Sequence, residues 1–108
     1  MTLEQKKCVP CEGGLDPLSK SEATEFMSQV PGWALSDNGD KIHRRFDFDD
    51  FVSSLEFINK LGDVAEAEGH HPDISFGWGY AEITFFTHAI SGLHENDFIM
   101  AAKTNQLI

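Results

Sequence analysis

The chain has 108 residues and carries 8 Lys and Arg against 18 Asp and Glu, a formal net charge of −10. This length fits one domain. An acidic chain lacks the basic surface that nucleic acids and anionic membranes attract, so we expect no nucleic-acid and no membrane partner. No apolar run approaches the roughly 18 residues of a membrane span. The first residues show no apolar secretory signal, and two cysteines make no disulfide framework, so a cytoplasmic location is expected.

The first 18 residues differ from the rest because two prolines and two adjacent glycines disfavour regular structure. We expect residues 1–18 to form an N-terminal arm with a Cys8-x-x-Cys11 pair, and residues 19–108 to form a single domain. The pair has no second pair or histidine at zinc-ribbon spacing, and it does not lie between a strand and a helix. We therefore expect incidental or structural roles for both cysteines.

The domain begins with a predicted helix. Ser19 and Glu22 have the spacing of a capping box, and Pro31 is the expected end of the helix. Two strands over residues 33–36 and 41–48 follow, joined by an Asn-Gly turn that tolerates the positive φ of a tight hairpin.

A second helix of about five turns follows these strands. Asp49 and Asp50 favour its N-terminus, and Gly69 is its expected end. Its predicted buried stripe consists of apolar residues spaced by three and four positions, namely Phe51, Val52, Leu55, Ile58, Leu61 and Ala65. Two further strands, over residues 74–78 and 81–88, turn at residues 79–80, and a last helix runs from His94 to about residue 105.

The predicted order is α-β-β-α-β-β-α. Strands joined by tight turns pair antiparallel, so the fold class is α+β, a four-stranded antiparallel sheet with three helices packed on one face. Trp78 and Phe86 add apolar bulk to the last two strands. We therefore expect self-association, as a dimer or a tetramer, through the other sheet face or an edge.

Three of the five histidines converge in this predicted fold. His70 and His71 follow the long helix, and His88 ends the last strand. The hairpin between the last two strands brings all three to the same end of the sheet. Glu66 lies one helical turn before His70, and Asp97 lies in the first turns of the last helix, so both carboxylates can reach the same place.

The residues alone leave three interpretations open. The histidines can be surface or capping residues. Three histidines and a carboxylate can also bind zinc or iron, although adjacent side chains such as His70 and His71 point apart and no H-E-x-x-H motif is present. The third interpretation is metal-free acid–base chemistry, because imidazoles take and give protons near neutral pH.

The run from Glu66 through His70, His71 and Pro72, followed by Trp78, His88 and Asp97, resembles the signature of the pterin-4a-carbinolamine dehydratases. The resemblance covers about residues 17–107, and the cysteine-containing arm resembles an extension found in some members only. Further matching segments are Pro31-Gly32-Trp33, Thr87-His88, Gly92-Leu93 and Glu95-Asn96-Asp97-Phe98.

This resemblance implies the α+β fold, assembled as dimers or tetramers, and dehydration of 4a-hydroxytetrahydropterin to quinonoid dihydropterin without a metal or cofactor. It places the functional histidines at His70, His71 and His88. We expect His70 and His88 to transfer protons and His71 to hold the pterin, with a share in the acid role as its alternative, while Glu66 and Asp97 contact the substrate or orient an imidazole. The implied partners are the pterin and a pterin-dependent aromatic amino-acid hydroxylase, whose cofactor the reaction recycles.

Two other functions compete with this expectation. One is a dimeric protein-binding module that uses the exposed sheet face and retains the histidines incidentally. The other is a histidine-based metalloenzyme.

Overall fold

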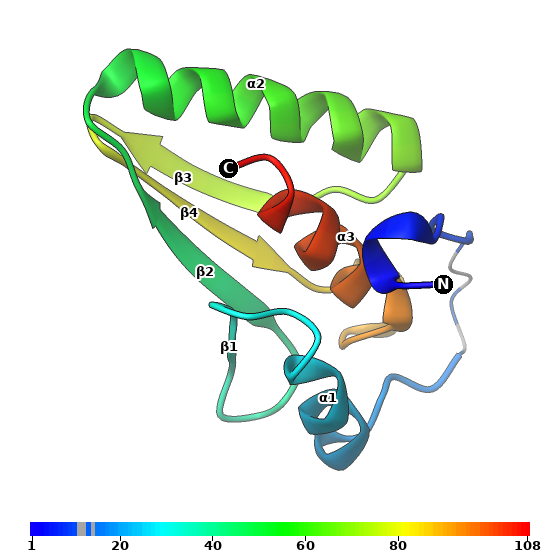
Figure 1. The fold of residues 1–108 in the computed structure, drawn as a ribbon. Helices are drawn as coiled ribbons and strands as arrows, with labels where there is room; N and C mark the ends of the chain where they lie inside the picture. The colour runs from blue at the N-terminus through cyan, green and yellow to red at the C-terminus, as the bar shows by residue number, and fades with distance from the viewer. Residues whose placement is uncertain (11–12, 14) are drawn as a thin grey trace.

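Three α-helices and four strands make up most of the described chain, residues 1–10, 13 and 15–108 of a computed structural model (Figure 1). The helices are α1 (Lys20–Met27), α2 (Phe51–Glu68) and α3 (Glu95–Asn105), and the strands are β1 (Ala34–Leu35), β2 (Ile42–Asp47), β3 (Asp73–Gly77) and β4 (Tyr80–Phe85). The α+β class and the element order are confirmed. Two short 3₁₀ helices, η1 (Leu3–Gln5) and η2 (His88–Ile90), were not predicted. No described helix is both long and apolar enough to cross a membrane.

The sheet is antiparallel throughout, in the order β1-β2-β4-β3. Its two central strands, β2 and β4, are neighbours although α2 and β3 separate them in the sequence. Their pairing runs from Ile42 opposite Phe85 to Asp47 opposite Tyr80. The start of β3 therefore lies beside the end of β4, at the end of the sheet where α2 also ends (Figure 1).

The hydrophobic core lies between the helices and one face of the sheet (Figure 1). Its buried side chains come from the central strands, α2 and α3, and include Ile42, Phe46, Ile83, Phe85, Phe57, Leu61, Ala65, Phe98 and Met100. The opposite sheet face carries charged side chains. There Arg45 on β2 pairs with Asp47 at 3.1 Å and with Glu82 on β4 at 3.5 Å. The core-facing alternation of β2 and β4 is thus as predicted.

The capping box of α1 is confirmed, but the helix is shorter than predicted. The Glu22 N–H donates to the Ser19 hydroxyl at 3.1 Å, and the Ser19 N–H donates to the Glu22 carboxylate at 2.9 Å. These bonds from the Ser19 backbone and hydroxyl lower the pKa of Glu22. The helix ends at Met27 rather than near Pro31, and a turn closed by the Val30 N–H and the Met27 carbonyl follows.

The buried face of α2 differs from the predicted stripe. Leu61 and Ala65 are buried as expected, but the first half of the helix buries Ser54 and Phe57. Phe51, Val52 and Leu55 face solvent instead. Two apolar stripes overlap in this part of the helix, and helical periodicity alone does not decide which one meets the sheet.

The last hairpin turns one residue earlier than predicted, at Trp78 and Gly79, so Asp73 pairs with Thr84 instead of Phe86. Each β3 residue therefore pairs with a β4 residue two positions earlier than predicted. Because side chains alternate between faces with a period of two, every side chain stays on its predicted face. The strand also ends at Phe85 rather than at His88.

The N-cap of α2 allows a stability prediction. The Ser53 N–H donates to the Asp50 carboxylate at 2.8 Å, and this bond lowers the pKa of Asp50 below its ordinary 3.8. Replacing Asp50 by Ala should lower the melting temperature, because a helix N-cap acceptor is lost. A lowered folded-state pKa means that the stabilisation is present above pH 3.8 and is lost as the pH falls through the lowered value. Thermal melts at pH 7 and pH 3 measure both effects, with Asp49→Ala as the matched control. An Asp50→Ala deficit that stays the same at pH 3 would contradict this assignment.

Candidate active site

A left-handed helix cap sets the position of the paired histidines. Gly69 ends α2 with φ 66°, a conformation that favours glycine, and its N–H donates to the Ala65 carbonyl. The His70 N–H donates to the same carbonyl at 3.2 Å. The chain therefore leaves the helix sharply and enters β3 after His70, His71 and Pro72.

His70 is held from behind by a buried carboxylate. Its Nε2 lies 2.6 Å from Oδ1 of Asp97, and the side chains are 11% and 0% exposed. Oδ2 of Asp97 accepts from the Thr87 hydroxyl at 2.8 Å and from the His94 N–H at 3.0 Å. Since carboxylate oxygens only accept, we assign the hydrogen of this contact to Nε2, which leaves Nδ1 of His70 for another partner.

His94 occupies the predicted helix start. It is the N-cap of α3, and its Nδ1 accepts from the Asn96 N–H at 3.0 Å. Asp97, three residues later, completes the capping box through the His94 N–H. The cap thus fixes the carboxylate that holds His70.

His71 and Glu66 form a second, exposed pair. Nε2 of His71 lies 2.6 Å from Oε2 of Glu66, and the two side chains are 59% and 78% exposed. Water screens this contact much more than the buried pair, so it orients the imidazole more than it stabilises the fold.

His88 comes from the segment that follows β4. Thr87 forms an isolated bridge with Gly92, and His88 begins η2 directly afterwards. The His88 ring lies on the Phe86 ring, with centroids 4.0 Å apart. His88 is exposed, so its imidazole is accessible to a ligand.

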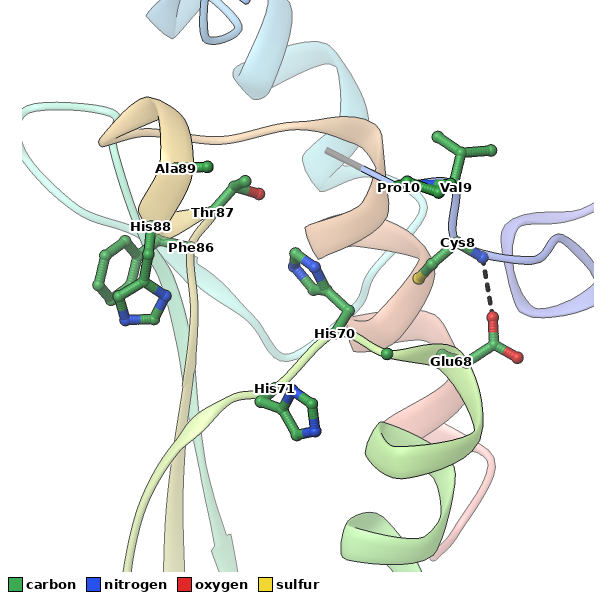
Figure 2. Close-up of a pocket in the computed structure, with 11 residues that line it drawn as sticks. Cys8, Val9, Pro10, Glu68, His70, His71, Phe86, Thr87, His88 and Ala89 are labelled. Atoms are coloured by element: carbon green, nitrogen blue, oxygen red, sulfur yellow. Dashed lines mark hydrogen bonds between the residues drawn. The ribbon is translucent and has the colours of Figure 1, made fainter. Parts of the chain in front are cut away.

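All three imidazoles line one pocket of about 450 Å³ (Figure 2). Its lining also includes Cys8, Val9, Pro10, Glu68, Gly69, Phe86, Thr87 and Ala89. Glu66 and Asp97 do not line it, and each reaches it only through a histidine. Within the described residues, no group of three His, Cys, Asp or Glu side chains is placed to hold a metal ion.

Sequence reasoning missed the contribution of the arm to this pocket. Cys8, which we expected to be incidental, lies in the pocket wall with Val9 and Pro10 (Figure 2). The other half of the predicted pair, Cys11, lies outside the described residues. The spacing of the cysteines gives no signal of this location, because the contacts that fix it join residues about 60 to 90 positions apart.

The fold and the pocket define a small α+β protein with three imidazoles around one cavity. A family model described as pterin 4 alpha carbinolamine dehydratase matches residues 16–107, and the chain belongs to this family of hydro-lyases.

Relatives and solved structures agree with this family. A relative from Azoarcus sp. (strain BH72), named for the same dehydratase, is 56% identical over 97% of this chain and 90% of its own. One from Methylococcus capsulatus is 52% identical over 98% and 93%. The crystal structure of a transcriptional coactivator/pterin dehydratase from Brucella melitensis superposes with TM-score 0.80 at 32% identity, over 85% of this chain and 98% of that chain.

A second structure widens the range of roles in this fold. It is a pterin dehydratase-like protein described as a RuBisCO assembly factor in the alpha-carboxysome. Its TM-score is 0.61 at 26% identity, over 70% of this chain and 88% of that chain.

Proposed function

We propose that this chain dehydrates 4a-hydroxytetrahydropterin to quinonoid dihydropterin by acid–base catalysis at His70 and His88. The observation that carries the proposal is the buried contact between Asp97 and His70, in a pocket that also presents His71 and His88. The reaction breaks the C4a–O bond and removes one ring N–H proton, and the products are the quinonoid dihydropterin and one water molecule.

His70 serves as the general base in this proposal. With the Nε2 hydrogen donated to Asp97, Nδ1 accepts the ring proton, and the carboxylate 2.6 Å away stabilises the imidazolium that forms. Asp97 is a positioning residue, because it is buried and does not line the pocket.

His88 serves as the general acid. It lies across the pocket from His70 (Figure 2), and its imidazolium protonates the departing hydroxyl so that water leaves. Proton return from His70 to His88 through solvent completes the cycle. The test is a stopped-flow or hydroxylase-coupled assay of carbinolamine dehydration, in which the protein should raise the rate well above the uncatalysed one. A folded protein that gives no acceleration would refute the proposal.

His71 binds the substrate, with Glu66 orienting its imidazole. His71→Ala should therefore raise KM and change kcat little, because a binding contact acts on the ground and transition states alike. Glu66→Gln should show a smaller effect in the same direction, since its amide oxygen can still accept from the imidazole. Steady-state kinetics of both variants checks this prediction. A His71→Ala variant with unchanged KM and strongly reduced kcat would assign it to proton transfer instead.

Self-association is the second part of the proposal, and the exposed side of α2 with the adjoining edge strand β3 is the surface that best supports it. Phe86 lines the pocket, and Trp78, in the hairpin turn, is 70% exposed. The exposed apolar side chains of α2 are Phe51, Val52 and Leu55. The Phe51 ring lies 5.8 Å from that of Phe76, so this apolar surface continues onto β3. A second copy with the same self-complementary surface would cover it.

Light scattering at micromolar concentration should show a dimer or tetramer. Val52→Asp should shift the mass toward the monomer, because it places a carboxylate within the apolar surface. Gln29→Glu, an exposed change after α1, is the control for added charge and should leave the mass unchanged. A monomeric wild-type protein would contradict self-association.

Protein binding is the alternative function, and the same exposed apolar surface favours it. One of the two similar solved proteins is described as a transcriptional coactivator as well as a pterin dehydratase, and the other as a RuBisCO assembly factor. The dehydration assay separates the two functions, because a binding module needs no imidazole. Dehydratase activity that depends on His70 and His88 would support the catalytic function over the protein-binding one.

A further inference from the structure

We propose that the N-terminal arm forms one wall of the substrate site, and that Glu68 and Asn96 are positioning residues that hold this wall in place. This inference rests on the proposed function, because it assigns a role in binding the same pterin. The matched family region begins at residue 16, after Cys8, Val9 and Pro10, so this wall lies outside the part of the chain that the family model matches.

The arm is anchored to the domain before it reaches the pocket. Leu3 of η1 is buried in the hydrophobic core. Lys6 pairs with Glu95 of α3 at 3.0 Å, and Lys103, also of α3, donates to the Glu4 carbonyl at 2.9 Å. Contacts from η1 and from Lys6, directly after it, thus hold the arm against α3, and this part of the arm belongs to the packed structure.

Two side chains then fix the backbone of the arm at the pocket. Asn96, 2% exposed, accepts from the Val9 N–H at 3.0 Å and donates to the Val9 carbonyl at 2.6 Å. Glu68, at the end of α2, accepts from the Cys8 N–H at 2.8 Å. Side chains of the domain thus bind the N–H and the carbonyl of Val9 and the N–H of Cys8. These three hydrogen bonds hold the arm in place at the pocket.

The side chains that hold the arm and the proposed general base, His70, come from the same turn of α3. Asn96 holds Val9, and the next residue, Asp97, holds His70. The wall is therefore fixed relative to the imidazole that we assign as the base. Figure 2 shows the arm on one side of the pocket and Phe86 with His88 on the other, with His70 and His71 between them.

The chemistry of this wall suits a flat heterocycle. Cys8, Val9 and Pro10, whose side chains are small and largely apolar, line one side of the pocket, and His88, packed against the Phe86 ring, lies on the other side. A bicyclic pterin bound in this pocket would bury apolar surface against the arm while its polar edge meets the imidazoles. The wall contacts parts of the substrate that do not react, so it acts on binding more than on the chemical step.

The Glu68 variants test the positioning role. Glu68→Ala removes the acceptor of the Cys8 N–H, whereas Glu68→Gln removes the charge and keeps an acceptor oxygen. Glu68→Ala should raise KM by roughly threefold to tenfold with little change in kcat, as expected for the loss of one hydrogen bond. Glu68→Gln should recover most of the lost affinity. KM values raised equally in both variants would show that the charge itself binds substrate, and this would overturn the positioning role.

Variants of the arm test the wall directly. Val9→Trp should lower kcat/KM by roughly tenfold or more, because a large ring at an exposed position of the wall would occupy ligand space without disturbing the core. Leu15→Trp, an equally bulky change at an exposed residue that does not line the pocket, is the matched control. Thermal melts confirm that all variants are folded.

The outcomes separate the two proposals. A wild-type protein without dehydratase activity would overturn the proposed function together with the role of the arm in it. An active wild-type protein whose Glu68→Ala and Val9→Trp variants keep its kinetic constants would overturn the arm proposal alone.

Discussion

Replacing either His70 or His88 by Ala is expected to lower kcat by roughly 100-fold or more, because each replacement removes one group that transfers a proton in the transition state. The assay is the steady-state rate of carbinolamine dehydration at saturating substrate. The fold should survive both changes, since His88 is exposed and Asp97 keeps two hydrogen-bond donors, the Thr87 hydroxyl and the His94 N–H, when His70 is replaced.

His43→Ala is the matched control for this pair. His43 is exposed on β2 and does not line the pocket, so kcat and KM should both stay at the wild-type values. A His70→Ala or His88→Ala variant that keeps wild-type kcat would remove that residue from the proton-transfer step.

Replacing Asp97 by Asn should also lower kcat by roughly 100-fold or more, although Asp97 does not line the pocket. An Asn amide can donate to Nε2 of His70, which would place the imidazole hydrogen on Nδ1 and remove the acceptor that the base needs. The measurement combines kinetics with ¹⁵N NMR of the His70 ring, which should report the hydrogen on Nε2 in the wild-type protein and on Nδ1 in the variant.

Thr87→Val is the control for the environment of this carboxylate. It removes the hydroxyl that donates to Oδ2 of Asp97 but leaves the contact between Asp97 and His70 in place. Its kcat loss should therefore be much smaller than that of Asp97→Asn. Similar kcat losses in Thr87→Val and Asp97→Asn would contradict control of the His70 tautomer by Asp97. They would show instead that the hydrogen bonds among Thr87, Asp97 and His70 act only together.

Local patterns predicted most of the fold. The capping box at Ser19 and Glu22, the helix start after Asp49 and Asp50, and the glycine stop at Gly69 each depend on a few neighbouring residues, and all are found in the structure. The buried face of α2 was mistaken because Phe51, Val52 and Leu55 form a stripe as regular as the one that is buried. The choice between these stripes depends on the sheet that packs against them, which helical periodicity does not contain.

The site was predictable where it depends on neighbouring elements. The long helix delivers His70 and His71, and one hairpin brings His88 to the same pocket even though its turn lies one residue earlier than expected. The sequence did not reveal that Asp97 is buried behind His70 rather than exposed to substrate. It also did not reveal the arm, since Asn96 and Val9 are 87 positions apart.

The most direct test of the account is the rate of carbinolamine dehydration by the folded His70→Ala/His88→Ala double variant, compared with the wild-type protein and the uncatalysed reaction. Because acid and base act as a unit, the loss in the double variant should be smaller than the product of the single losses, and its rate should lie close to the uncatalysed one. Near-wild-type dehydratase activity in this folded double variant would contradict the assignment of proton transfer to these two imidazoles.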